Sequence, residues 1–309
     1  MNILITFNDA YVIPTKVMLK SLIMNNDSSE FDIFVVYESL SAHSIELIHE
    51  IESPSIRLQF LQISYDKLGT CPVTGGWSRD TYVRLFVQNY LNDDLDRILY
   101  LDGDIIVNKS IQDFYDQEFE GNYYIAVEDQ VQGRSEERHR KLNMPLDSPY
   151  VCAGVLLINL REIKKCVDDN SILEFINQNK DKLDYLDQDV LNGLFYQHIK
   201  VVENFQYNFF PFRVKWNNIR EWHRDVKIIH YGGDNKPWQR GYRYSGYQLW
   251  WRYALTLGDE YRRLYRRNYL SCLISRLEHG VALFMQDKMP SVFMVAARVY
   301  MKKKEAAQT

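Results

Sequence analysis

The 309-residue sequence has few cysteines, and none of them lie at metal-binding spacing. Cys71, Cys152, Cys166 and Cys272 are scattered, without a CxxC pair. Zinc modules and small disulfide-stapled folds depend on clustered cysteines. The sequence therefore fits neither class, and we expect reduced thiols of the kind found in the cytoplasm.

Long hydrophobic runs are also missing. No uninterrupted apolar stretch approaches the ~20 residues that a membrane-spanning helix needs. The nearest candidate, residues 289–301, is short and contains Arg298. The first ten residues, MNILITFNDA, lack the basic start and long apolar segment of a signal peptide. We therefore expect a cytoplasmic protein that spans no membrane, with attachment to the membrane surface left as a possibility.

The sequence carries no excess of positive charge. Its formal net charge is −4 and its pI is about 6.0, which argues against a nucleic-acid-binding protein. Positive charge is nevertheless concentrated near the C-terminus, in residues 261–267 (YRRLYRR) and 302–304 (KKK). Internal repeats and low-complexity linkers are absent as well, and the length allows one large domain with an appendage or two small domains.

Alternating strand and helix patterns open the chain. Residues 2–7, 31–39 and 56–64 have the apolar content of buried strands, and residues 14–26 and 41–52 show helical spacing. Ser41 is the expected cap of the second helix. This β-α-β-α-β order predicts an α/β fold with a mainly parallel central sheet flanked by helices. Further strands are predicted at 97–107, 124–129 and 154–160, helices at 79–91, 171–183 and 186–198, and extended chain at 199–212.

A change in composition near residues 241–247 (GYRYSGY) suggests a soft domain boundary. We place the catalytic domain at residues 1–245 and a helical region, rich in basic and aromatic residues, at 246–309. Pro290 is expected to end the last long helix, because proline lacks the amide that a helix interior requires.

Two aspartates stand one residue apart in the stretch LYLDGDIIVN, directly after an apolar run. Asp102 and Asp104 should lie at the carboxyl end of a sheet strand, where α/β proteins bind their ligands. Two carboxylates this close repel each other unless one is protonated or a cation lies between them. Oxygen ligands suit Mg²⁺ or Mn²⁺ completed by substrate phosphates, and Gly103 would let the backbone approach a ligand. The alternative is a solvated acidic turn.

Two later segments carry similar chemistry. Asp187, Gln188 and Asp189 lie near the start of a predicted helix, where one or more could instead be an ordinary cap. The segment HYGGDNKPW begins with His230, which could complete a metal ligand set or be a hydrogen-bonded core residue. Its two glycines would let backbone amides face a phosphate, and Lys236 could neutralise a leaving diphosphate.

Taken together and in order, these motifs resemble glycosyltransferase family 8, which comprises metal-dependent, retaining enzymes of the GT-A fold that use UDP-sugars. Bacterial lipooligosaccharide α-galactosyltransferases are among its members. The resemblance runs from Asn2 to about Trp238. It includes FNDAYV, TYVRL, ILYLDGDIIV, AGVLLINL, LDQDVLNGLF and HYGGDNKPW.

The resemblance implies a role for each matching residue. The metal, Mn²⁺ or Mg²⁺, would be bound by Asp102, Asp104 and His230. The UDP-hexose would be held by Asn8, Asp9, Tyr11, Arg84, Asp102, Gly103, Asp104, Ala153, Gly233 and Lys236. The transferred sugar would be surrounded by Asp129, Asp187 and Gln188.

The resemblance also implies the chemistry. Retention usually requires a carboxylate nucleophile, but this family has a glutamine on the β-face of the sugar, here Gln188. A front-face reaction, in which the acceptor hydroxyl attacks from the side that UDP leaves, is the family's usual explanation. The expected activity is transfer of galactose or glucose to a glycan or lipid-linked saccharide, in the synthesis of cell-surface polysaccharide or lipopolysaccharide.

Two departures from the galactosyltransferase pattern bear on the donor. Cys152 stands where that pattern has an asparagine before AGVLLIN. Asn8 and Ala10 stand where related enzymes carry an acid and an asparagine. Both changes leave the metal and phosphate residues intact, but they leave the donor sugar undecided between galactose and glucose.

Two alternatives remain at this stage. A DxD phosphatase would carry its aspartates on the first strand, and this chain has NDA there. A catalytically silent nucleotide-sugar-binding or scaffold protein of the same fold would be supported by Cys152 and Ala10 alone.

Residues 246–309 interleave Tyr, Trp and Arg, which suits contact with an anionic membrane surface. Family members that modify lipid-linked glycans use such tails for peripheral attachment, so the resemblance favours this partner. Packing of the tail on the core is the alternative. Acceptor contacts are expected from residues 69–78 and 205–212, and no nucleic-acid partner is expected.

Overall fold

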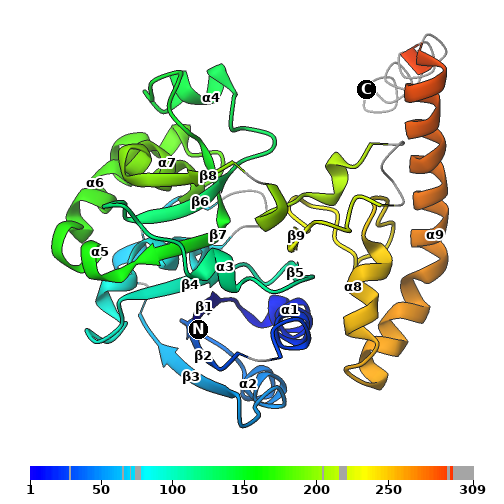
Figure 1. The fold of residues 1–309 in the computed structure, drawn as a ribbon, viewed down its shortest axis with the longest axis horizontal. Helices are drawn as coiled ribbons and strands as arrows, with labels where there is room; N and C mark the ends of the chain where they lie inside the picture. Colours follow the sequence, from blue (N-terminus) through cyan, green and yellow to red (C-terminus); the bar gives the residue numbers. More distant parts are fainter. Residues whose placement is uncertain are drawn as a thin grey trace. The chain divides into compact units, whose positions relative to one another are not determined.

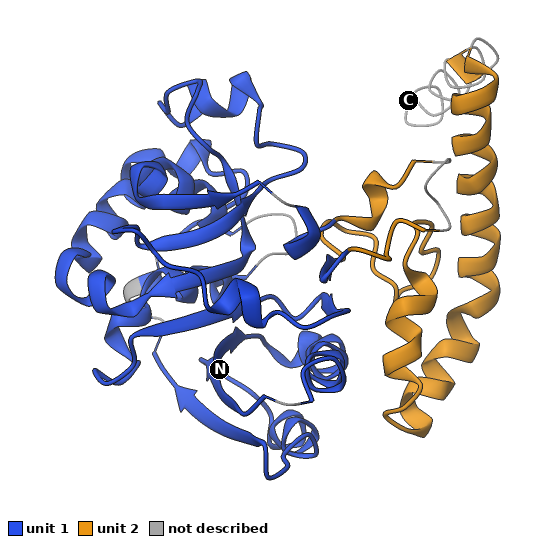
Figure 2. Cartoon of the chain, in the orientation of Figure 1, with its two compact units in different colours: residues 1–209, 226–230 blue, residues 210–225, 231–309 orange. Residues whose placement is uncertain are grey.

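The fold was analysed in a computed structural model. It describes residues 1–27, 29–64, 66–69, 71–73, 78–203, 205–215, 221–290 and 293–294. The middle of the predicted acceptor loop, the KKK segment and most of residues 291–301 lie outside the described residues. The described chain divides into two compact units, shown in Figure 2. Unit 1 comprises Met1–Phe209 and Val226–His230, and unit 2 comprises Phe210–Asp225 and Tyr231–Thr309.

Unit 1 is built on a seven-stranded sheet, as far as the described residues show, with the order β3-β2-β1-β4-β7-β6-β8. Its strands are β1 Asn2–Thr6, β2 Phe31–Tyr37, β3 Ile56–Gln62, β4 Arg97–Leu101, β6 Tyr124–Glu128, β7 Val151–Asn159 and β8 Ile199–Val202. Neighbouring strands are parallel except at β7, which is antiparallel to both β4 and β6. The predicted mainly parallel α/β sheet is confirmed.

Helices accompany this sheet along the chain (Figure 1). In unit 1 they are α1 Val12–Met24, α2 Ala42–His49, α3 Gln112–Tyr115, α4 Glu136–Lys141, α5 Leu160–Cys166, α6 Asp169–Asn179 and α7 Asp187–Phe195. Ser41 caps α2 as its sequence suggests, because its hydroxyl accepts a hydrogen bond from the amide of Ser44. Most of the strand and helix positions expected from the sequence are therefore confirmed.

A continuous hydrophobic core lies between the sheet and helices α5, α6 and α7. Strand residues such as Leu4, Tyr100 and Leu156 meet helix residues such as Ile172 and Val190, all of them at most 1 % exposed. Burial of this kind contributes roughly 25 cal/mol per Å² of apolar surface, which makes the sheet a rigid platform for the ends of its strands.

Two expectations about local structure are wrong. Residues 79–91 form two 3-10 stretches, Arg79–Leu85 and Val87–Asn89, in place of one α-helix. The Nε of Arg84 donates to the carbonyl of Thr81 at 2.9 Å, and that carbonyl would otherwise serve the amide four residues later. A buried side chain thus competes with helix formation.

The other correction concerns residues 199–212, which were expected to be extended. Among the described residues of this range, β8 is the one strand, and Phe209 adds an isolated bridge to Ile229. Turns of 3-10 type lie at Phe205–Tyr207 and Pro211–Arg213. The second turn has Pro211 at its first position, where the missing amide costs nothing.

A small second sheet completes unit 1. Strands β5 Ile105–Val107 and β9 Ile228–His230 pair antiparallel, and Ile105 is opposite His230. The chain therefore leaves the large sheet after β4, turns at Gly103 and Asp104, and enters the small sheet at β5. This change of sheet brings residues from the middle and from the end of unit 1 together.

Unit 2 contains helices α8 Tyr247–Ala254 and α9 Asp259–Lys288. Aromatic residues fill its interior, and Trp250 and Trp251 meet edge to face with ring centroids 4.7 Å apart. Helix α9 ends two residues before Pro290, as expected. No helix in the described part of the chain is both long and apolar enough to cross a membrane. The division of function at residue 245 stays a prediction.

Candidate active site

Two aspartates and a histidine converge where β4 passes into β5. Among the described residues, Asp102, Asp104 and His230 are the group whose ligand atoms all lie within 4.8 Å of one another. Nε2 of His230 is 3.2 Å from Oδ1 of Asp104 and 3.6 Å from Oδ2 of Asp102. The pairing of Ile105 with His230 sets this approach, since Asp104 directly precedes Ile105.

The aspartates meet in a way that differs from the expected extended strand. Gly103 and Asp104 lie in a turn, and a Cβ on Gly103 would overlap Oγ1 of Thr15 in α1. The glycine is therefore required at least by packing against α1. Its predicted contact with the donor stays a prediction.

Gly154, on β7, is equally constrained. A Cβ at this position would overlap Cε1 of His230 and lie 2.6 Å from Oδ2 of Asp102. Its carbonyl accepts a hydrogen bond of 2.9 Å from the amide of Asp102. The absence of a side chain at Gly154 thus allows the histidine and the aspartate to occupy the same small space.

This donor set fits a divalent cation. Two carboxylates and an imidazole are common ligands of Mn²⁺, and Mg²⁺ prefers the carboxylates. Burial alone would lower the pKa of His230, but the neighbouring Asp104 carboxylate outweighs it and raises the pKa to about 10. Without a metal, the imidazolium of His230 can therefore supply the positive charge that two adjacent carboxylates need.

A second layer of residues orients these ligands. Nδ1 of His230 is 3.0 Å from Oδ1 of the buried Asn208 and 3.9 Å from Sγ of Cys152. A hydrogen bond from Nδ1 to the asparagine leaves Nε2 facing the aspartates, which is the tautomer a metal ligand requires. Asn208 was expected only as part of residues 205–212, the segment assigned to acceptor contacts, because a lone asparagine has no distinguishing pattern.

Arg84 is buried behind Asp102. Its Nη2 is 3.1 Å from Oδ1 of Asp102, its Nε is 3.1 Å from Oδ2 of Asp187, and its Nη1 donates to the carbonyl of Ala153 at 2.6 Å. The hydroxyl of Tyr100 also donates to Oδ1 of Asp102, at 2.6 Å. These contacts fix Asp102 with Oδ2 directed toward His230. Contact between Arg84 and the donor stays a prediction.

Asp187 is a buried carboxylate at the first position of α7. Burial raises its pKa to about 6, although the charge of Arg84 acts in the opposite direction. The repulsion from Asp102 adds to the rise. Of the acidic residues near the start of α7, Asp187 is therefore the one that Arg84 ties to the aspartate pair.

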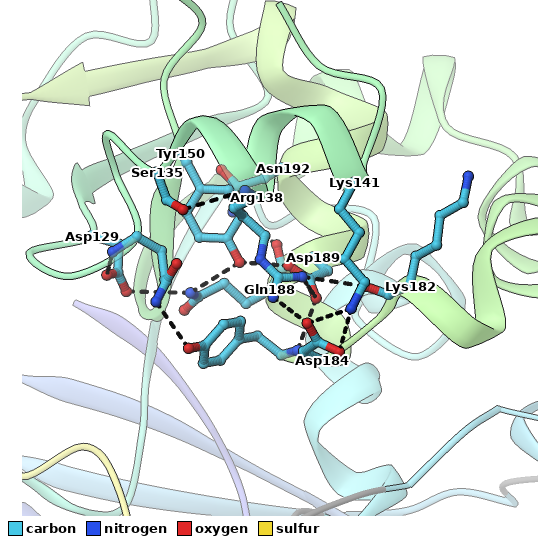
Figure 3. Close-up of polar contacts among 12 residues, drawn as sticks. Asp129, Ser135, Arg138, Lys141, Tyr150, Lys182, Asp184, Gln188, Asp189 and Asn192 are labelled. Carbon is cyan, nitrogen blue, oxygen red and sulfur yellow. Dashed lines mark hydrogen bonds and ion pairs between the residues drawn. The ribbon is translucent and has the colours of Figure 1, made fainter. Parts of the chain in front are cut away.

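Gln188, the next residue after Asp187, contacts Asp129. The Nε2 of Gln188 donates to Oδ2 of Asp129 at 3.2 Å, and the amide of Ala153 donates to Oε1 of Gln188 at 3.1 Å. The other oxygen of Asp129 accepts from two backbone amides. Three predicted site residues are thereby connected, and Figure 3 shows Gln188 directed toward Asp129.

Asn8 and Asp9 follow β1. The side chain of Asn8 accepts from the amide of Ala10 and donates to Asp80 at 3.1 Å. Oδ1 of Asp9 accepts hydrogen bonds from Ser41 and Ser44, and the bond from Ser44 is the main cause of its lowered pKa. Their predicted contacts with the nucleoside, and that of Tyr11, stay predictions.

Gly233 and Lys236 belong to unit 2. Gly233 has a φ of +80°, a conformation that favours glycine, and Nζ of Lys236 donates to the carbonyl of Tyr231 at 2.8 Å. The conformation of the turn at residues 231–236 therefore depends on Gly233 and on the hydrogen bond between Lys236 and Tyr231. The binding of diphosphate by this segment stays a prediction.

Comparison with known proteins assigns the family. The family described as glycosyl transferase family 8 matches residues 2–241. The chain is a member of glycosyl transferase family 8. This membership decides against the phosphatase alternative and identifies the protein as a glycosyltransferase.

This family 8 glycosyltransferase is similar to curated enzymes. It is 27 % identical to a lipopolysaccharide 1,2-glucosyltransferase of Escherichia coli, over 77 % of this chain and 73 % of the relative. It is 33 % identical to a lipopolysaccharide 1,3-galactosyltransferase of Salmonella typhimurium, over 57 % of this chain and 54 % of the relative.

Among solved structures, the galactosyltransferase LgtC in complex with donor and acceptor sugar analogues has a TM-score of 0.75 and 27 % identity. The match covers 85 % of this chain and 100 % of LgtC. The predicted GT-A fold of the family 8 chain is thereby confirmed.

Proposed function

We propose that this glycosyltransferase moves a hexose, galactose or glucose, from a UDP-sugar to a saccharide acceptor with retention of configuration. The observation that carries the proposal is the convergence of Asp102, Asp104 and His230 at the end of β4 in a family 8 chain. Similarity to glucosyl- and galactosyltransferases of lipopolysaccharide supports a lipid-linked saccharide of the cell surface as the acceptor.

The proposed metal is Mn²⁺, with Mg²⁺ as the alternative. Asp102, Asp104 and His230 would hold it, and a divalent cation supplies neutralisation of the diphosphate leaving group. A site with one imidazole and two carboxylates favours Mn²⁺ over Mg²⁺, because Mg²⁺ prefers oxygen ligands only.

We also assign roles to the residues proposed to surround the transferred sugar. Gln188 would face the reacting carbon from the β-side, and Asp129 and Asp187 would bind sugar hydroxyls. A solved variant of LgtC is described as an active-site mutant in which glutamine is replaced by glutamate. That description supports a glutamine at the centre of the reaction in this chain too.

The test is UDP release from a panel of UDP-sugars, measured with Mn²⁺, with Mg²⁺ and with chelator. We expect metal-dependent turnover of one hexose donor, with Asp104→Asn lowering both turnover and metal affinity by at least about 100-fold. Asp147→Asn is the matched control, since this exposed aspartate lies outside the site. Unchanged metal affinity in Asp104→Asn, measured by Mn²⁺ electron paramagnetic resonance, would contradict the metal assignment.

A catalytically silent protein would give a different pattern. It would bind UDP with the metal but release none from any donor, even with a deacylated lipopolysaccharide core as acceptor. Turnover in the presence of such an acceptor would also identify the acceptor class.

We further propose that unit 2 attaches the enzyme to an anionic membrane surface. Exposed apolar side chains recur along α9 at intervals of three and four residues: Leu270, Ile274, Leu277, Val281 and Phe284. Exposed arginines precede them at positions 262, 263, 266 and 267. Apolar side chains beside basic ones suit the interface of a membrane that carries anionic lipid.

A further inference from the structure

The carboxamide of Gln188 has partners on both of its polar atoms. Figure 3 shows the two partners of its nitrogen, Asp129 and Tyr150. Nε2 donates to Oδ2 of Asp129 at 3.2 Å and to the hydroxyl of Tyr150 at 3.3 Å, whereas Oε1 accepts from the amide of Ala153. A carboxamide can turn by 180° with little change in shape, so only its partners decide which atom lies on which side.

Tyr150 alone would not decide this orientation, because a hydroxyl both donates and accepts. Its hydroxyl, however, also lies 2.7 Å from Oδ1 of Asp189, and an ionised carboxylate only accepts. The proton of Tyr150 is therefore committed to Asp189. The oxygen of Tyr150 is left to accept, and Gln188 must offer Nε2 to it.

Asp189 is fully buried and rigidly held in this role. Its Oδ2 accepts from the amide of Tyr185 at 2.8 Å and pairs with Nη1 of Arg138 at 3.1 Å. Arg138 also pairs with Asp184, which in turn pairs with Lys141. Burial raises the pKa of Asp189 above its usual value, and the hydrogen bonds from Tyr150 and Tyr185 and the charge of Arg138 limit that rise. The ion pair with Arg138 is the contact expected of a carboxylate.

We propose that Asp189 and Tyr150 are positioning residues that fix the orientation of the Gln188 carboxamide. The proposal rests on the role given to Gln188 under the proposed function. The Ala153 amide uses one of the two lone pairs of Oε1, so the oxygen keeps acceptor capacity toward the sugar. The reversed carboxamide would present an NH₂ group there and would repel positive charge developing at the reacting carbon.

Asp129 acts on the same nitrogen from the other side. Its Oδ1 accepts hydrogen bonds from the amides of Val131 and Gln132, each at 2.7 Å. Its Oδ2 is likewise an acceptor, so it favours the NH₂ group of Gln188 on its side. Gln188 is thus oriented directly by Asp129 and, through Tyr150, by Asp189. Loss of Tyr150 is expected to weaken the orientation without abolishing it.

The experiment is a double-mutant cycle between Tyr150→Phe and Gln188→Ala, with kcat and donor KM measured for each variant. Tyr150→Phe keeps the ring and removes only the hydroxyl. We expect kcat to fall about tenfold with donor KM changed less than twofold, and no further loss when Gln188 is already alanine. Asp189→Asn should behave like Tyr150→Phe, since an asparagine can donate to the tyrosine oxygen.

Tyr124→Phe is the matched control. Tyr124 is fully buried in the same core, and its hydroxyl has no hydrogen-bond partner in the described structure. Removal of this hydroxyl should leave kcat unchanged, which separates the effect of Tyr150 from the general effect of a Tyr→Phe change.

Two outcomes would overturn the proposal. The first is an equal loss from Tyr150→Phe in the wild-type and Gln188→Ala backgrounds, which would show that Tyr150 acts independently of Gln188. The second is neutron diffraction that places the carboxamide deuterons away from Asp129 and Tyr150. Deuterons in the expected positions, combined with full activity of Gln188→Ala, would confirm the orientation and refute only the catalytic role of Gln188.

Discussion

Nδ1 of His230 lies 3.0 Å from Oδ1 of Asn208, on the side of the imidazole ring away from Asp104. Asn208 is buried and reaches the ring from the turn that follows Phe205–Tyr207. The contact holds the imidazole ring with Nε2 toward the two aspartates, and so would orient His230 for the proposed metal.

Asn208→Ala is therefore expected to lower the affinity for Mn²⁺ by about 10–100-fold, the usual effect of removing a partner that orients a metal ligand. Isothermal titration calorimetry with Mn²⁺ measures this directly. Asn208→Asp keeps an acceptor at Nδ1 and should retain most of the affinity. Equal losses in both variants would show that the orientation of the ring does not matter.

Gly154→Ala should disturb the same site from the opposite side. The added methyl would overlap His230 and crowd Asp102, so we expect at least about a tenfold loss of Mn²⁺ affinity. Gly193→Ala is the control, because its methyl would overlap Phe175 and no metal ligand. Both variants should lower the melting temperature, but only Gly154→Ala should lower metal affinity.

From the raised pKa of Asp187 we expect the stability of the metal-free protein to depend on pH. Its pKa is about 6 in the folded state and 3.8 as the reference value, so the folded state holds the proton more tightly. Stability contributed by this group is greatest below pH 4 and is lost as pH rises through 6. Relative to Asp187→Asn, the wild type should lose roughly 2 kcal/mol of unfolding free energy between pH 4 and pH 7.

Urea unfolding of the two proteins at several pH values tests this difference. A constant difference across that range would mean that Asp187 titrates normally. Asp147→Asn, at an exposed position, should show such a constant difference and provides the comparison.

Cys152 gives a prediction about the donor. Cys152 lies on β7, at the position where the galactosyltransferase pattern has asparagine, and its thiol is close to Nδ1 of His230. Cys152→Asn should increase the kcat/KM ratio for UDP-galactose over UDP-glucose by roughly tenfold, the scale of one added polar contact. Cys152→Ser, a smaller change in size, should leave the ratio nearer the wild type. An unchanged ratio in Cys152→Asn would remove this residue from donor selection.

From the exposed apolar side chains of α9 we expect the protein to bind membranes. Leu270 and Leu277 are 66 % and 62 % exposed, and replacing both with glutamate should release the protein from vesicles that contain anionic phospholipid. Co-sedimentation measures the bound fraction. Glu278→Gln, on the same helix, should bind at least as well as the wild type. Undiminished binding of the double glutamate variant would contradict attachment through this face.

The sequence was sufficient for the parts of the fold that follow local patterns. The apolar strands and the Ser41 cap depend on neighbouring residues, and so they could be predicted. The helix expected at residues 79–91 does not form, because the side chain of Arg84 donates a hydrogen bond to the backbone carbonyl of Thr81. The ion pairs of Arg84 with Asp102 and Asp187 hold the side chain in that position.

Long-range contacts account for the rest of what was missed. Asn208 has no motif of its own. Gly154 lies in the AGVLLINL motif, but its contact with His230 and Asp102 appears only when β9 has paired with β5. Asp189 was noticed as part of an acidic cluster, but its partner Arg138 lies in α4, far away along the chain. Such partners are set by topology, which the local pattern of a single sequence does not contain.

The two-stranded sheet of β5 and β9 has a consequence for folding. Asp102 and Asp104 are made early in the chain, but His230 reaches them only after β9 has paired with β5. A partly folded chain therefore lacks the complete ligand set, and a metal that binds only the native state stabilises it by about 2.7 kcal/mol at a concentration 100 times its dissociation constant. Binding of the proposed metal would thus report completion of unit 1.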